Sequence, residues 1–166
     1  KFKYNERDKR CQRIKKCLQE QLIRLYNQGV RCFWAGGAMG ADMWASEILL
    51  HMKEQTAYQD VELCLALPFE GYNADWDDWH RKRMDFICRY AEKVLVLGEM
   101  PSSESYKKRN YYMVEQAGHM IAVYDNAHNM RSGTQQTVNY AKKKGLQIIY
   151  IHPDTAQVTE EDITKK

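Results

Sequence analysis

The sequence predicts an α/β protein in which helices cover both faces of a mostly parallel sheet, a three-layer α/β/α arrangement. Short apolar runs alternate along the chain with segments whose apolar residues recur at helical spacing. This alternation is typical of parallel strands joined by helices. With 166 residues, 44% of them hydrophobic, the chain fits a single domain over 1–166, because domains most often hold roughly 100 to 150 residues.

The elements follow one another in a regular order. Apolar residues at helical spacing over 6–28, followed by Gly29, predict an amphipathic helix. A right-handed βαβ unit places a strand before such a helix, so we expect an N-terminal strand to be missing here. The polar residues after Pro153 predict a loosely held tail over 153–166. The remaining pattern predicts strands over 30–35, 61–67, 93–98, 119–125 and 147–151, and helices over 41–52, within 74–91, and over 108–117 and 133–144.

Composition narrows the class of protein. The five cysteines are scattered without CxxC spacing, which favours reduced thiols over a zinc site or a disulfide framework. The formal charge of +3 is mild and disfavours nucleic acid as the partner. Since no apolar run approaches the ~20 residues of a membrane span, we expect a cytoplasmic protein with no metal and no membrane partner.

The loops after the strands hold the candidate binding residues, because ligands of open parallel sheets bind beyond the carboxyl ends of the strands. The first loop reads AGGAMGAD. Gly36, Gly37 and Gly40 allow close backbone approach and leave helix N–H groups for an anion. A tight strand-to-helix turn explains the same glycines. Asp42 is either an acceptor for sugar hydroxyls or a helix cap.

The second and third loops add aromatic and basic residues. Trp76 is a candidate for stacking on a base, although core packing is the commoner role of such a ring. Glu70 is a candidate acceptor from ribose or base. Arg109 and Asn110 are expected at the start of a helix from about 108, after a flap of some ten residues, where they are suited to bind phosphate and a base or ribose edge. A solvated charge run is the alternative interpretation.

The fourth loop leads into another helix through Ser132, Gly133 and Thr134. This start offers an anion-binding arrangement, and ordinary N-capping explains its hydroxyls equally well. For catalysis the sequence offers only the carboxylates of Asp42, Glu70 and Glu47. Five residues rotate a helix by about 140° beyond a full turn, which disfavours Asp42 and Glu47 as a catalytic pair.

The segments FWAGGAMGAD, LPFEGYNADW, RNYYMVEQAGHMIAVYD and SGTQQTVNYAKKKG occur in this order. Over about residues 5–151 the chain thereby resembles the YpsA-like proteins of the SLOG superfamily, which also holds the SMF/DprA proteins and the LOG enzymes. The resemblance implies a Rossmann-like fold and a nucleotide-derived ligand. Its motif positions are Gly36, Gly37, Gly40, Asp42, Trp76, Arg109, Asn110, Gly133 and Thr134.

Two departures from the family pattern matter. A strand ending in a TGHR-like turn, usual at the start of such proteins, would lie just before Lys1. The catalytic glutamate of the LOG enzymes is replaced by Thr137 in MRSGTQQT, which weakens a hydrolase assignment because threonine lacks the carboxylate.

Three functions remain open, in decreasing order of preference. The first is binding or sensing of an ADP-ribose-like or NAD-like molecule, with no required cofactor. The second is hydrolysis or transfer at a nucleotide N-glycosidic bond, as in LOG-like phosphoribohydrolases. The third is single-stranded DNA binding, as in DprA-like proteins. The sequence leaves a homo-oligomer open.

Overall fold

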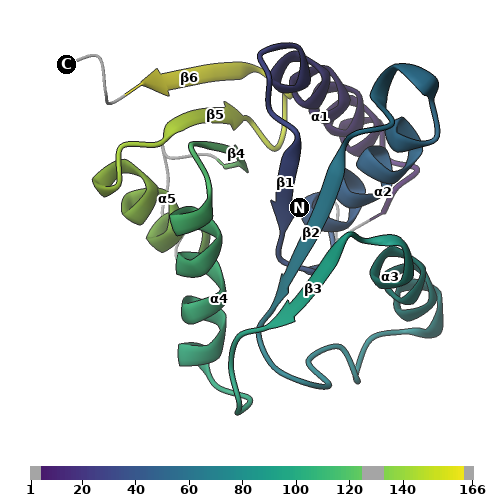
Figure 1. The fold of residues 1–166 in the computed structure, drawn as a ribbon, viewed down its shortest axis with the longest axis vertical. Helices are drawn as coiled ribbons and strands as arrows, with labels where there is room; N and C mark the ends of the chain where they lie inside the picture. Colours follow the sequence, from purple (N-terminus) through teal and green to yellow (C-terminus); the bar gives the residue numbers. More distant parts are fainter. Residues whose placement is uncertain (1–4, 125–132, 163–166) are drawn as a thin grey trace.

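The computed structural model describes residues 5–124 and 133–162, and these confirm an α/β protein (Figure 1). The helices are α1 (Lys9–Asn27), α2 (Ala41–Lys53), α3 (Asp78–Tyr90), α4 (Ser103–Gln116) and α5 (Gly133–Lys143), with a short 3-10 helix at Thr56–Tyr58. The strands are β1 (Cys32–Ala35), β2 (Glu62–Leu67), β3 (Lys93–Val96), β4 (His119–Val123), β5 (Gln147–Ile151) and β6 (Val158–Asp162).

The strands form two sheets, where a single sheet was expected. One sheet has the order β1-β2-β3 and is parallel throughout, and the other has the order β4-β5-β6. β4 and β5 are parallel, whereas β6 is antiparallel to β5. β1 and β4 are the end strands nearest to each other in Figure 1. Strands must lie about 4.8 Å apart to share hydrogen bonds, and within the described residues no strand links these two.

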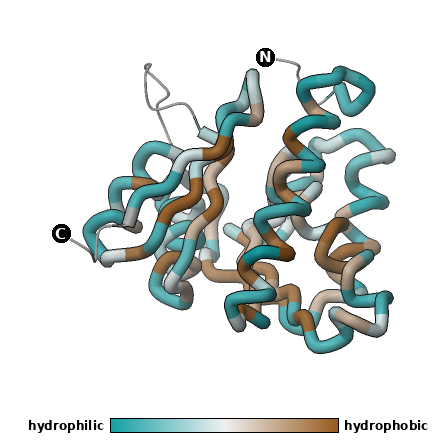
Figure 2. The backbone as a smooth tube through the Cα atoms, turned by 90° about the horizontal axis from the view of Figure 1, so that it is seen from above, coloured by the Kyte–Doolittle hydropathy of each residue, from teal (hydrophilic) through white to brown (hydrophobic). Residues whose placement is uncertain are grey.

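The packing nevertheless has three layers. Alternate residues of a strand point to opposite faces of its sheet. Ile149 of β5 packs into the hydrophobic cluster that α1, α2 and α3 share with β1 and β2, whereas its neighbour Ile148 packs with α4 and α5. Figure 2 shows hydrophobic residues along the strands and hydrophilic turns on the outer sides of the helices. The sheets therefore lie between two helical layers.

The tail differs from the loosely held segment that we expected over 153–166. Val158–Asp162 forms β6, and Val158 packs against the hydrophobic core. A turn reverses the chain before it, with the His152 N–H donating to the Gln157 carbonyl at 2.9 Å. The sequence did not indicate this strand, because Val158 is its one apolar residue and the residues after it are polar. Residues 163–166 lie outside the described part of the chain.

The helix predicted from about 108 begins five residues earlier, at Ser103. Ser102 caps it by accepting a hydrogen bond from the Ser105 N–H at 3.4 Å, and the Ser105 hydroxyl donates to the Met100 carbonyl at 2.6 Å. These local hydrogen bonds set the helix start. The loop after β3 is thus shorter than the predicted ten-residue flap. Arg109 and Asn110 lie within the helix, and their expected position at its start was wrong.

No helix in the described ranges is long and apolar enough to cross a membrane.

Candidate ligand-binding site

A cavity of about 210 Å³ lies where the parallel strands end. Its lining comes from three segments: the loop after β1, the loop after β2, and α4, which follows β3. The residues are Ala38, Met39, Tyr72, Trp76, Tyr106 and Arg109. The cavity thus occupies the edge of the sheet at which open parallel sheets bind ligands.

Gly36 is held from both sides at the rim of this cavity. Its N–H donates to Oδ2 of Asp42 at 3.0 Å, and its carbonyl accepts a hydrogen bond from Nη1 of Arg109. A Cβ atom at this position would lie 2.7 Å from Nη1 of Arg109 and 2.8 Å from Oδ2 of Asp42. Glycine at this position lets the two charged side chains approach the backbone closely, and a Cβ would displace their ends.

Gly37 is required for its backbone conformation. Its φ of 74° lies in the left-handed region that favours glycine. The Tyr72 hydroxyl donates to the Gly37 carbonyl at 2.7 Å, which ties the second loop to the first. Burial raises the pKa of Tyr72 far above its ordinary value, so the phenol stays protonated as a donor. Gly40, with a φ of 86°, precedes α2 as its N-cap.

Arg109 is a buried cation whose described hydrogen-bond partners are uncharged. Arg109 is only 7% exposed. Besides Gly36, its Nε donates to Oδ1 of Asn110 at 2.6 Å. The guanidinium carbon lies 5.6 Å from the ring centre of Tyr106. Burial lowers the pKa of Arg109, and the negative charge of Asp42 counters this effect.

Asn110 extends this row of residues toward α5. Its Nδ2 lies 3.6 Å from the position that a Cβ on Gly133 would take. Arg109 and Asn110 therefore lie between Gly36 of the first loop and the start of α5. Thr134 is exposed in the first turn of α5, and the Thr137 hydroxyl donates to the Gly133 carbonyl at 2.7 Å. Ser132 lies outside the described residues.

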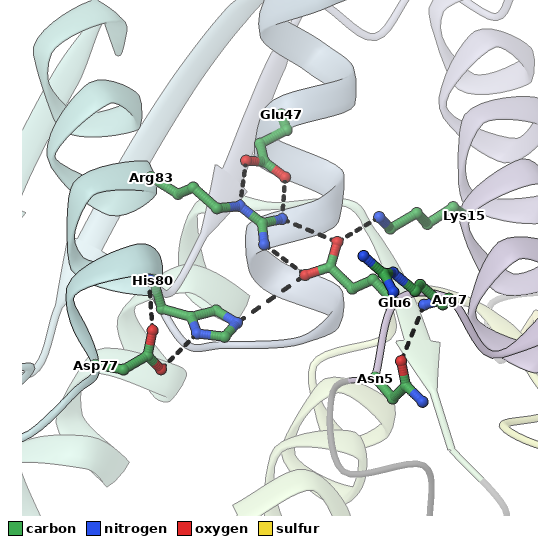
Figure 3. Close-up of polar contacts among 8 residues, drawn as sticks. All are labelled: Asn5, Glu6, Arg7, Lys15, Glu47, Asp77, His80 and Arg83. Carbon is green, nitrogen blue, oxygen red and sulfur yellow. Dashed lines mark hydrogen bonds and ion pairs between the residues drawn. The ribbon is translucent and has the colours of Figure 1, made fainter.

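The three candidate carboxylates lie in different surroundings. Asp42 lies near the cavity residue Arg109, since both contact Gly36, whereas Glu70 is exposed; neither carboxylate is among the lining residues. Glu47 accepts two hydrogen bonds from Arg83, at 2.9 and 2.7 Å, in a cluster that also holds Glu6 (Figure 3). Within the described ranges, no three His, Cys, Asp or Glu side chains are grouped as a metal site.

Four lining residues, Ala38, Met39, Tyr72 and Tyr106, were not predicted as site residues. Tyr106 precedes Arg109 by three residues and so lies on the same face of α4. An earlier helix start in the prediction would have placed this ring beside the guanidinium.

The fold and the cavity define an α/β protein with its candidate site at the carboxyl edge of a parallel sheet. The chain belongs to the YspA SLOG family, whose model matches residues 2–156. It is 30% identical over 134 residues to a UPF0398 protein of Bacillus cereus strain ATCC 14579, a match that covers 80% of this chain and 71% of the relative. A UPF0398 protein of Bacillus thuringiensis strain Al Hakam is 28% identical with the same coverage. The resemblance seen in the motifs is thereby confirmed.

Proposed function

We propose that this chain binds or senses a nucleotide-derived small molecule, of the ADP-ribose or NAD type, in the cavity beside Gly36. The observation that carries the proposal is Arg109, a buried guanidinium that lines the cavity and whose described hydrogen-bond partners are uncharged. A buried charge is costly unless an opposite charge or strong hydrogen bonds compensate it. Asp42 offsets part of this charge without a hydrogen bond to the guanidinium in the described part of the chain, and an anionic group of a ligand would add direct hydrogen bonds.

Among the residues that the structure describes, the guanidinium has donors left for such a group. Arginine carries five N–H donors in a planar fork, and the contacts with Gly36 and Asn110 use two of them. Phosphate oxygens fit the remaining donors, often in a bidentate manner. This supports a phosphate-bearing ligand over a neutral one.

The residues in and beside the cavity support a ligand with a flat ring and a sugar. Trp76 and Tyr106 present aromatic surface to the cavity, and such rings stack on nucleobases. Asp42 uses Oδ2 for the Gly36 N–H, and its second oxygen can accept from a ribose hydroxyl. The cavity is smaller than the roughly 300–1,000 Å³ of typical ligand sites, so it would hold one part of a dinucleotide-sized ligand.

The placement of the carboxylates gives no support to an N-glycosidic hydrolase. Glu47 is bound to Arg83 and Glu70 is outside the lining, which leaves Asp42 alone. Glycoside hydrolysis generally needs two carboxyl groups across the scissile bond. Binding without turnover is therefore the function we favour.

Thermal unfolding with AMP, ADP-ribose and NAD tests this proposal. A ligand at 100 times its Kd stabilises the fold by about 2.7 kcal/mol, so the melting temperature of the wild-type chain should rise with at least one of the three. Arg109→Lys should lose most of this shift, because a lysine cannot reproduce the planar fork. Arg13→Lys, an exposed change on α1, should retain it. Absence of a shift with all three compounds contradicts the proposal, and release of free base would favour the hydrolase.

A further inference from the structure

Large apolar side chains gather on the outer side of α3. Trp79, Phe86 and Tyr90 are 66%, 53% and 56% exposed. A helix turns by about 100° per residue, so positions seven and eleven residues after Trp79 return to within about 20° of it. The three rings form one stripe, separate from the face of Met84 and Ile87 that packs into the core.

The strand that follows α3 in the chain also exposes apolar side chains. Val94 and Val96 of β3 are 39% and 44% exposed. They pair with Leu65 and Leu67 of β2, and both leucines belong to the core cluster on the α3 side of the sheet. Paired residues of parallel strands point to the same face, so the valines lie on that side too. In Figure 1, α3 runs beside β3 at the outer end of the sheet.

We name the residues Trp79, Phe86, Tyr90, Val94 and Val96 the α3–β3 surface. Isolated exposed apolar residues are common, whereas three large aromatic rings along one stripe of a helix are typical of an interaction site. Any partner must cover this stripe and also match the charges at its margin.

The charged residues beside the aromatic stripe can pair with the same residues of a second copy of this chain. Lys82, Asp85 and Arg89 are exposed and follow one side of the aromatic stripe, between about 40° and 100° from Phe86 by helical rotation. Asp85 and Arg89 stand two residues on either side of Ile87.

We propose that the α3–β3 surface binds a second copy of this chain, with the two α3 helices antiparallel across a twofold axis near Ile87. In antiparallel helices, the same flank of each copy faces the other. Asp85 of one copy then faces Arg89 of the other, and this pair occurs twice. A twofold interface requires this kind of self-complementarity. The mixture of acidic and basic residues gives no strong attraction to a nucleic acid or an anionic membrane.

Sedimentation equilibrium over a range of protein concentrations tests the interface. The wild-type chain should reach the mass of a dimer. Phe86→Glu places a charge in the centre of the stripe and should sediment as a monomer. Met100→Glu, a change at a residue that is 68% exposed but lies outside α3 and β3, should leave the dimer intact. A monomeric wild-type chain up to millimolar concentration, or a dimeric Phe86→Glu variant, overturns the proposal.

Charge reversals test the antiparallel arrangement itself. Asp85→Arg and Arg89→Asp should each weaken self-association, because like charges then face each other across the axis. A mixture of the two variants should form a heterodimer, since each charge meets its opposite again. If a substitution weakened association only by disturbing the helix of its own chain, mixing the two variants would not restore association. Circular dichroism verifies that each variant is folded, and folded variants that do not associate on mixing contradict this arrangement. The result is independent of ligand binding.

Discussion

Arg109 donates a hydrogen bond to the carbonyl of Gly36, a residue 73 positions earlier in the chain. The contact joins α4 to the turn between β1 and α2, while Asp42 accepts from the N–H of the same glycine. One residue without a side chain therefore positions a buried cation and a carboxylate at the rim of the cavity. This relationship leads to the first prediction.

Gly36→Ala should weaken ligand binding more than it changes stability. The added Cβ meets the ends of the Arg109 and Asp42 side chains at 2.7 and 2.8 Å, and both can swing away. We expect the free energy of unfolding to change by less than about 1 kcal/mol, and the ADP-ribose-induced rise in melting temperature to shrink. Gly118→Ala, where no atom lies within 4 Å of the added Cβ, is the control and should keep the full rise. An unchanged ligand response in Gly36→Ala would show that the position of Arg109 does not matter for binding.

Gly37→Ala should destabilise the fold strongly. Its φ of 74° is strained for alanine, and the Cβ would lie 2.5 Å from Cδ2 of Leu67 and 2.7 Å from the Tyr72 hydroxyl. Gly71 has a similar φ of 76° but open space around the Cβ position, so Gly71→Ala measures the backbone cost alone. We expect urea unfolding to give about 2 kcal/mol more destabilisation for Gly37→Ala, because crowding in a packed site adds about 1–3 kcal/mol. Equal losses for the two variants would rule out the crowding.

The sequence allowed the elements around the site to be predicted, because strands and amphipathic helices leave periodic apolar patterns. Gly36, Gly37, Asp42, Trp76 and Arg109 were all chosen from their places after strands. What the pattern could not contain is the pairing of Gly36 with Arg109, since contacts between distant segments depend on how helices pack. The predicted helix start at 108 also hid the shared face of Tyr106 and Arg109.

The role of Glu47 shows the same limit. Its spacing from Asp42 indicated correctly that the two carboxylates diverge on α2, but nothing in the local sequence identified its partner. Arg83 lies 36 residues away on α3 and binds Glu47 through two hydrogen bonds. The separation into two sheets was likewise invisible, because a strand's sequence does not reveal which edge is paired.

Arg83→Met should destabilise the fold more than a matched change at an exposed arginine. Arg83 has a side chain that is 12% exposed and lies between Glu6 and Glu47, so its loss leaves two carboxylates without their shared cation. We expect a loss of about 2 kcal/mol in urea unfolding, below the roughly 3–5 kcal/mol of a fully buried pair. Arg81→Met breaks an ion pair with Asp78 whose side chains are 41% and 78% exposed, and should cost at most about 1 kcal/mol. Similar costs for both variants would mean that the Glu6–Arg83–Glu47 cluster adds no stability.

Acid should weaken the anchoring of the chain before α1. Burial by itself raises the pKa of Glu6. The hydrogen bonds from Arg83 and Lys15 outweigh this effect and bring the pKa from an ordinary 4.5 down to about 2. In the unfolded chain Glu6 takes up its proton near pH 4.5, whereas in the folded chain it stays charged to about pH 2. The contribution of Glu6 to stability is therefore complete above pH 4.5 and is lost as the pH falls toward 2. Urea unfolding of Glu6→Gln should show a lower stability at neutral pH and a flatter dependence on pH in this range. Glu20→Gln, a change at an exposed residue of α1, should reproduce the wild-type curve, and a Glu6→Gln curve parallel to the wild type would contradict the assigned pKa.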